Sequence, residues 1–257
     1  MFPLPIADTT RVRYRTIPWM TIFLILLNVG VWFHTEVQLL LWGPTYATPH
    51  GPIDAEIISH FVYGTVPDAV RQQQGSGALS AITSTFLHAP GFLICLPFSW
   101  HLFGNMIFLF AFGRRIEDAC GPYRFLFFYL LAGVIASTAS IIIRNGSAYD
   151  RLIPGIGASG AIAGVMGAFL ILFPGTRITT IPLIGIIPIP IRIKIPALLY
   201  LVWWLAQQVI PAVESARGES YYTTDFVAHL AGFFAGLLIF LFVRKDLLYR
   251  YITGSKL

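Results

Sequence analysis

Six apolar stretches, each near the length that crosses a lipid bilayer, limit what this chain can fold into. Only 11% of its residues are charged, well below the roughly 25% typical of a soluble domain, so much of the folded surface must face lipid. We therefore predict an all-α membrane protein, a bundle of six transmembrane helices near residues 17–33, 98–112, 125–143, 159–173, 195–210 and 226–243.

The basic residues support this count, because cytoplasmic segments of membrane proteins are enriched in lysine and arginine. With a cytoplasmic N-terminus, thirteen of the 17 basic residues fall in inner segments. The outer segments hold only Arg71, Arg144, Arg151 and Arg217. We predict a cytoplasmic segment 1–16, a six-span membrane domain 17–243 with a long outer loop 34–97, and a cytoplasmic tail 244–257.

The net charge of +5 gathers on the predicted cytoplasmic face, where membrane lipids with anionic headgroups are the expected contact, and nothing indicates binding to nucleic acid. The first apolar run has no convincing cleavage site, so we expect it to be retained as an anchor rather than removed as a signal peptide. Cys95 and Cys120 fall on opposite sides of the membrane in this topology, which excludes a disulfide bond between them.

The fourth apolar stretch, 159–173, is unusually short. As a helix it would be only about 22 Å long, against a hydrocarbon core of about 30 Å. We expect this short central helix to begin inside the membrane, after irregular backbone over 152–158 that is buried in protein or lines a wet cavity. The apolar stretch 181–191 contains three prolines, so it is predicted to be an extended cytoplasmic connection rather than a seventh span.

Small residues predict how the short helix packs. Gly160 and Gly164 are four residues apart, and Gly232 shares one helical face with His229 in the sixth span. Small residues at such spacing let two helix backbones approach closely in a membrane. We therefore expect the fourth and sixth spans to be in contact, with Ser159 facing His229.

Ser159 and His229 supply the minimal pair for nucleophilic catalysis. A serine hydroxyl is a poor nucleophile until a base takes its proton, and a neutral imidazole is suited to that task near neutral pH. A buried carboxylate would be costly here, so we predict a dyad. Asp225, one turn before the histidine, is a weaker candidate for orienting it.

A tetrahedral intermediate also needs hydrogen-bond donors for its oxyanion. Backbone amides near Gly157 and Ser159 are candidates, and so are the side chains of His101 and Asn105, which lie four residues apart on the second span. Alone, a buried serine is more simply explained as a hydrogen-bonding link between helices, and Asn105 is open to the same explanation. A single intramembrane histidine fits such a link and a functional role equally well. These four polar residues, Ser159, His101, Asn105 and His229, all lie in the outer halves of their spans, which favours a catalytic site. Residues that only link helices would not need to lie at the same depth in the membrane.

Four more histidines lie in or beside the long outer loop: His34, His50, His60 and His88. None has the spacing of a known zinc motif, so we expect no metal and no other cofactor. We expect these four histidine side chains to be solvated or to lie at the membrane interface.

Four motifs resemble those of the rhomboid family of intramembrane serine proteases. They are Gly157-Ala-Ser159-Gly followed by Ala-Ile-Ala-Gly, His101-Leu-Phe-Gly-Asn105, Ala228-His229-Leu-Ala-Gly232, and Phe112-Gly-Arg-Arg-Ile-Glu117 leading to Gly121. The resemblance extends over nearly the whole chain from residue 17 to residue 243, and the combination of motifs is highly specific.

The resemblance implies that Ser159 is the nucleophile, His229 the general base, and His101 and Asn105 the oxyanion-hole donors. It also implies cleavage of single-span transmembrane proteins near the outer membrane surface, without cofactor or metal, and a helix-packing role for Glu117. The six spans and short N-terminus are most similar to the basic prokaryotic form. That form implies a multi-pass protein of the prokaryotic inner membrane with both termini in the cytoplasm.

Two departures from the family pattern lie in the loop that borders substrate entry. Leu79-Ser80 stands where members often carry a Trp-Arg pair, and segment 92–98 lengthens the chain before His101. The alternative function is a non-catalytic rhomboid-like protein that binds or escorts transmembrane clients, and the intact Ser159 and His229 argue against it. A transporter would show internal repeats or a paired intramembrane charge, and neither is evident.

Overall fold

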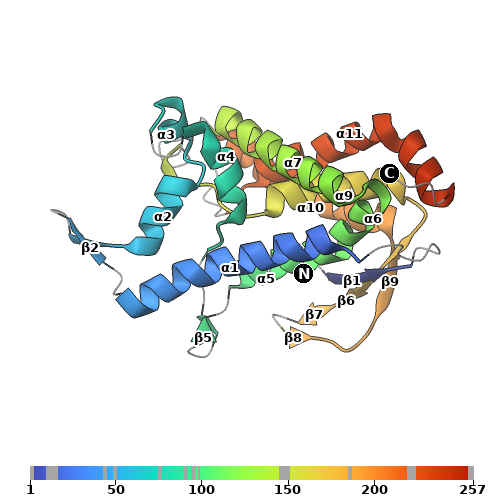
Figure 1. Ribbon diagram of the computed structural model, residues 1–257, viewed down its shortest axis with the longest axis horizontal. Helices are drawn as coiled ribbons and strands as arrows, with labels where there is room; N and C mark the ends of the chain where they lie inside the picture. The colour runs from blue at the N-terminus through green and yellow to red at the C-terminus, as the bar shows by residue number, and fades with distance from the viewer. Residues whose placement is uncertain are drawn as a thin grey trace.

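The fold is a bundle of helices with a small β-sheet at one end (Figure 1). It comes from a computed structural model. The structure describes residues 3–9, 17–42, 45–48, 51–74, 77–89, 92–93, 96–97, 99–144, 151–184, 187–218 and 224–253.

Each predicted span coincides with a helix. The second span lies on α5, which continues through five π-helical residues, η3, into α6 without leaving the helical path. The main helices are α1 (Trp19–Trp42), α5 (Trp100–Phe108), η3 (Leu109–Gly113), α6 (Arg114–Cys120), α7 (Pro122–Ile143), α9 (Ser159–Leu172), α10 (Ala197–Arg217) and α11 (Phe226–Thr253).

Among the described residues, three of these helices are long and apolar enough to cross a membrane: α7, α10 and α11. The apolar part of α1, Trp19–Thr35, and the whole of α9 are shorter. The predicted all-helical membrane fold is therefore confirmed in its class, whereas the count of six crossings stays a prediction.

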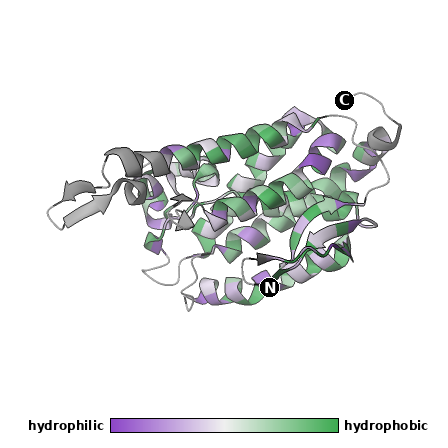
Figure 2. Ribbon diagram, turned by 90° about the horizontal axis from the view of Figure 1, so that it is seen from below, coloured by the Kyte–Doolittle hydropathy of each residue, from purple (hydrophilic) through white to green (hydrophobic). Residues whose placement is uncertain are grey.

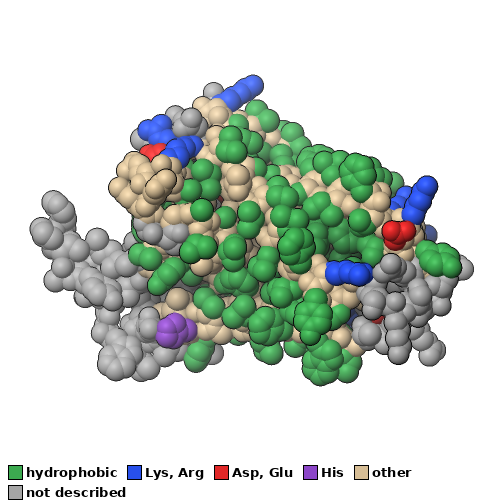
Figure 3. Space-filling view, turned by 45° about the horizontal axis from the view of Figure 1, so that its top comes forward, with side chains coloured by type: hydrophobic (Ala, Val, Ile, Leu, Met, Phe, Trp, Pro, Cys, Tyr) green, Lys and Arg blue, Asp and Glu red, His purple; other side chains and the backbone are tan. Residues whose placement is uncertain are grey.

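Apolar side chains cover much of the exposed surface of the bundle. On the face shown in Figure 3, hydrophobic side chains cover the middle, and most of the Lys and Arg side chains lie toward the two ends. The helices are mostly hydrophobic along their length in Figure 2 as well. Large apolar side chains such as those of Phe127, Leu238 and Phe242 are exposed. So large an apolar surface suits contact with lipid rather than water.

The short helix α9 is the buried centre of the bundle and packs against α7 and α11 (Figure 1). Added Cβ atoms at Gly232 and Gly236 of α11 would lie 2.0 and 1.9 Å from the carbonyl oxygens of Gly160 and Gly164 of α9, so the two backbones touch. The predicted contact between the fourth and sixth spans is confirmed, and glycine is what permits it.

Glu117 joins α6 to the start of α1. One carboxylate oxygen accepts the Met20 N–H at 2.9 Å, and the other accepts the Thr21 N–H at 2.8 Å and the Thr21 hydroxyl at 2.7 Å. These amides belong to the first turn of α1, where they have no acceptor within the helix and where a negative charge is favoured. The packing role expected for Glu117 is therefore that of a helix cap supplied by another helix.

A three-stranded antiparallel sheet closes the predicted cytoplasmic end, in the order β1 (Leu4–Asp8), β6 (Arg177–Ile181), β9 (Ile193–Pro196). Both carboxylate oxygens of Asp8 accept from the Arg115 Nε at 3.0 Å, and the two side chains are almost fully buried. The start of the chain is therefore part of the fold, which the sequence did not predict. The short hairpin β7 (Leu183–Ile184) and β8 (Ile187–Pro188) is extended, as expected.

The predicted outer loop begins later than expected, because α1 continues to Trp42. The loop contains several short helices. Segment 92–98, which lengthens the chain before His101, contributes the paired strands β4 and β5. The elements are β2 (Thr45–Thr48), β3 (Gly51–Asp54), α2 (Ala55–Tyr63), α3 (Pro67–Arg71), η1 (Gly77–Leu79), α4 (Ser80–Thr83), η2 (Ser84–Phe86), β4 (Phe92–Leu93) and β5 (Leu96–Pro97).

Candidate active site

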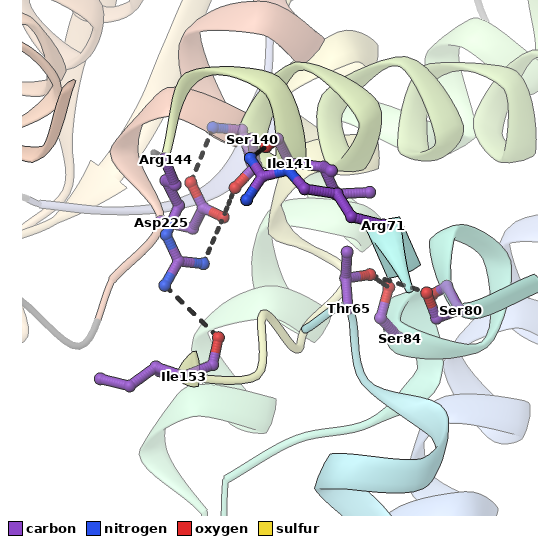
Figure 4. A network of polar contacts seen from close by, with 10 residues as sticks. Thr65, Arg71, Ser80, Ser84, Ser140, Ile141, Arg144, Ile153 and Asp225 are labelled. Carbon is purple, nitrogen blue, oxygen red and sulfur yellow. Dashed lines mark hydrogen bonds and ion pairs between the residues drawn. The ribbon is translucent and has the colours of Figure 1, made fainter. Parts of the chain in front are cut away.

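Ser159 is the first residue of α9, directly after the N-cap Ala158. The irregular backbone that leads into it is held by backbone hydrogen bonds to the outer segments. Thr65 and Gly155 exchange both of their backbone hydrogen bonds, at 2.9 and 2.8 Å, and the Thr65 hydroxyl donates to the Ser84 hydroxyl (Figure 4). Non-helical backbone inside the bundle is thus satisfied by protein, as the sequence analysis expected.

Gly157 has the backbone conformation and the contacts that only glycine permits. Its φ is +117°, and an added Cβ would lie 2.8 Å from Cε1 and Nε2 of the His101 ring and 3.8 Å from the Ser159 Oγ. The missing side chain therefore leaves room for the His101 ring next to the Ser159 hydroxyl.

Gly157 is a predicted contributor to the oxyanion hole, but its amide is engaged elsewhere in this structure. Its N–H donates to the Ser84 carbonyl oxygen at 2.9 Å and so holds the backbone before Ser159. The Ser159 N–H, at the first position of α9, has no acceptor within the helix and stays a candidate donor.

His101 and Asn105 extend from α5 toward the same place. The Ala89 N–H donates to the His101 Nδ1 at 3.3 Å, which leaves Nε2 as the ring nitrogen that carries the proton. One N–H of the Asn105 amide donates to the His101 carbonyl oxygen at 2.9 Å. The other N–H of that amide and the His101 Nε2–H are both available as donors to a bound group.

His229 lies on α11, and its ring is close to two aromatic side chains, Trp204 and Phe226, at ring-centre distances of 5.8 and 6.0 Å. Its Nδ1 is 2.9 Å from the Oε1 of Gln208 on α10. Its Nε2 is buried and has no hydrogen-bond partner among the described residues. Gln208 is a site residue that the sequence analysis did not identify.

Asp225 does not orient the His229 ring. One of its carboxylate oxygens caps α11 through the Ala228 N–H at 3.0 Å. The other accepts the Ser140 hydroxyl and lies 3.5 Å from the Arg144 guanidinium, which also donates to the Ile153 carbonyl oxygen at 3.4 Å (Figure 4). This network ties α7, the start of α11 and the backbone before Ser159 together.

Ser159, His229, His101 and Asn105 line a single cavity of about 550 Å³. Three different helices and the start of α9 meet there. Its lining combines apolar side chains with a small set of polar groups, which is typical of a binding site. A nucleophile, a base and oxyanion donors within one cavity are the elements of acyl transfer to serine.

His88 differs from the expectation of a solvated side chain. It is only 2% exposed, its ring centre is 5.1 Å from that of His101, and burial lowers the pKa of its imidazole to about 3. Burial also lowers the pKa of His60. Among the described residues, which do not include His50, no three His, Cys, Asp or Glu side chains lie close enough together to hold a metal ion.

Residues 76–246, more than half of the chain, match the family model of the rhomboid domain. The chain is 30% identical over 146 residues to Rhomboid protein 1, mitochondrial, of Saccharomyces cerevisiae, a match that covers 57% of this chain and 38% of that protein. It is 25% identical over 173 residues to Rhomboid-like protein 11, chloroplastic, of Arabidopsis thaliana, covering 64% and 52%.

A third relative is the Rhomboid protease GluP of Bacillus subtilis, which is 43% identical over 70 residues, covering 27% of this chain and 12% of that protein. The chain therefore spans about half or less of the length of these relatives.

Proposed function

Because the chain belongs to the rhomboid family, we propose that it is an intramembrane serine endopeptidase that cleaves single-span transmembrane proteins near the outer membrane surface. The observation that carries the proposal is the convergence of Ser159, His229, His101 and Asn105 on one cavity inside an apolar bundle. A relative that is named a rhomboid protease supports it as well.

In the proposed first step the His229 Nε2 takes the Ser159 hydroxyl proton as the oxygen attacks the carbonyl carbon of the scissile peptide bond. The carbonyl oxygen becomes an oxyanion, which the Asn105 amide, the His101 Nε2–H and the Ser159 N–H stabilise. His229 then gives its proton to the leaving nitrogen as the C–N bond breaks. The products of this step are the released amine and an acyl ester on Ser159.

In the second step water attacks the ester carbonyl while His229 removes a proton from that water. The oxyanion forms against the same donors, and its collapse returns the proton to the Ser159 oxygen and releases the carboxylic acid. A second, small cavity of about 30 Å³ also reaches Ser159, and Thr65, Ser84 and Ser140 are among the residues that line it. A space of this size with polar residues in its lining suits water close to the reaction.

The alternative is a rhomboid-like protein that binds transmembrane clients without cutting them. Covalent labelling separates the two functions, because only an activated serine reacts with a fluorophosphonate. We expect the purified protein in detergent to form one adduct, located by peptide mass spectrometry on Ser159. An unlabelled Ser159 in a protein that still binds a transmembrane peptide would favour the client binder.

Asn105→Ala is expected to lower turnover of a model transmembrane substrate by about 10- to 1,000-fold without abolishing it, the range for loss of one oxyanion donor among several. Initial rates in proteoliposomes measure the effect. Gly30→Ala serves as a control, because an added Cβ at Gly30 meets nothing within 4 Å and Gly30 does not line the cavity. Equal rates for Asn105→Ala and wild type would leave Asn105 as a link between helices.

We further propose that both termini are cytoplasmic and that the active site opens toward the outer face of a prokaryotic cell membrane. Cysteine labelling tests this orientation. Burial raises the pKa of the Cys120 thiol to about 12, so Cys120 itself is a poor reporter. Exposed positions serve better: Gln72 after α3 on the predicted outer side, and Lys194 on β9 on the predicted inner side.

In a cysteine-free background, an impermeant maleimide applied to intact cells should label the Gln72→Cys variant. The Lys194→Cys variant should react only after the membrane is opened. Labelling of the two variants in the opposite order would invert the proposed orientation.

A further inference from the structure

Gln208 is a buried polar side chain on α10, a helix that contributes none of the predicted site residues. It is only 7% exposed. Its Nε2 donates to the Trp204 carbonyl oxygen at 3.0 Å, one turn earlier on α10, and its Oε1 lies 2.9 Å from the His229 Nδ1. Among the described residues, the hydrogen bond between α10 and the imidazole of the proposed base is therefore made by a neutral amide.

The direction of the Gln208 amide determines which imidazole nitrogen carries the proton. A carbonyl oxygen such as that of Trp204 only accepts, so the Gln208 NH₂ must point to it, and the Oε1 must face the imidazole. The Oε1 also only accepts, so the His229 Nδ1 is the ring nitrogen that donates. In a neutral imidazole the Nε2 is then left with a free lone pair, which is the form required of a general base.

We infer that Gln208 is a positioning residue of the proposed protease, which holds His229 in the tautomer and orientation that let Nε2 accept the Ser159 proton. The inference rests on the proposed function. Gln208 touches no reacting atom and acts through His229. It takes the place that a carboxylate occupies in a Ser-His-Asp triad, but it adds no charge to the interior of the bundle, where a charge is costly.

The other described groups around His229 do not accept its Nδ1 proton. Trp204 and Phe226 present aromatic rings to the imidazole, which restrict its position without accepting the Nδ1 proton. Three ionisable groups line the same cavity: His101 from α5, Arg144 from α7 and Asp225 before α11. The Asp225 carboxylate is engaged with Ser140, Arg144 and the Ala228 N–H.

The neighbouring residue provides a matched control. Gln207 donates to the carbonyl oxygen of Trp203 in the same way that Gln208 donates to Trp204, but its side chain is exposed on the other side of the helix. Gln207→Leu and Gln208→Leu therefore remove the same local hydrogen bond from adjacent positions. Only Gln208→Leu also removes the acceptor for His229.

The first test is a ¹⁵N NMR measurement of histidine-labelled protein in detergent, with the His229→Gln spectrum used to assign the His229 resonances. We expect wild type and Gln207→Leu to show a neutral imidazole protonated at Nδ1, and Gln208→Leu to show a mixture of tautomers. This measurement needs no proteolysis. A wild-type imidazole protonated at Nε2, or an unchanged tautomer in Gln208→Leu, would overturn the inference whether or not the protein is a protease.

The second test is the rate of substrate cleavage as a function of pH. Gln208→Leu is expected to lower kcat by about 10- to 100-fold with little change in KM, because general-base catalysis weakens while substrate contacts persist. Gln208→Glu restores an acceptor and should keep kcat within about tenfold of wild type. It should also move the acid limb of the kcat/KM profile to higher pH, because a carboxylate stabilises the protonated imidazole.

The second test distinguishes a positioning role of Gln208 from a structural one. Wild-type kcat in Gln208→Leu, or a Gln208→Glu variant as slow as Gln208→Leu, would show that the acceptor does not matter and overturn the inference. A rise in KM or a fall in thermal stability that Gln207→Leu shares would assign Gln208 a structural role only. If the wild type itself cleaves no substrate and forms no fluorophosphonate adduct, the proposed function fails, and the NMR result still decides whether Gln208 sets the tautomer.

Discussion

Replacement of Ser159 by alanine is expected to lower cleavage of a model single-span substrate by roughly 10⁴-fold or more, because it removes the atom that attacks the peptide carbonyl. The fold should survive the change. Ala158, not Ser159, occupies the N-cap of α9, so the helix loses no capping side chain. Cleavage in proteoliposomes, followed by gel or by a fluorescent reporter, measures the loss.

His229→Ala provides the companion measurement. Without the base the Ser159 hydroxyl keeps its proton, so this variant should be nearly as inactive as Ser159→Ala. The double variant should be no slower than either single variant, because the two residues act as a unit. Thermal melts in detergent establish that each variant is folded. Wild-type turnover by Ser159→Ala would end the serine-protease proposal.

Gly236→Ala is expected to destabilise the protein by about 2–4 kcal/mol and to inactivate it as well. The added methyl group would lie 1.9 Å from the Gly164 carbonyl oxygen and 2.6 Å from its carbon, so the backbones of α9 and α11 must move apart. Because α9 carries Ser159 and α11 carries His229, the same displacement separates the nucleophile from its base. The melting temperature in detergent and the cleavage rate measure the two effects.

Gly30→Ala is the matched control, the same substitution in the exposed part of α1, where an added Cβ meets nothing within 4 Å. Alanine favours a helix over glycine by about 1 kcal/mol, so this variant should melt no earlier than wild type. Equal melting temperatures for Gly236→Ala and Gly30→Ala would contradict the close packing of α9 and α11.

The helices and the central packing could be predicted because their signals are local. Apolar runs of spanning length and glycines four residues apart each report on a single helix, and the lipid surroundings leave few alternatives for such runs. The polar residues at the site were recognisable for a related reason. Ser159, His229, His101 and Asn105 each interrupt an apolar stretch, where a polar group needs an explanation.

The role of Gln208 could not be predicted from the sequence, because Gln207 lies next to it. Two adjacent glutamines on one helix differ only in the direction they face, and that direction depends on how α10 is rotated against α11. The engagement of the Gly157 amide by Ser84 escaped for a similar reason, since it depends on a contact between segments far apart in the sequence. Non-local geometry of this kind leaves no pattern in the residues themselves.

The pairing of β1 with β6 sets an order in which parts of the chain can fold during synthesis. The segment that begins with Leu4 is made before the helices, but its partner Ile181 is made only after α1 to α9 have been produced. Until then Asp8 lacks its place in the sheet, and Arg115 lacks the carboxylate that its burial requires. Residues made before the helices are therefore among the last to find their partners. A sheet that joins β1 to β6 reports that the helices between them are in place.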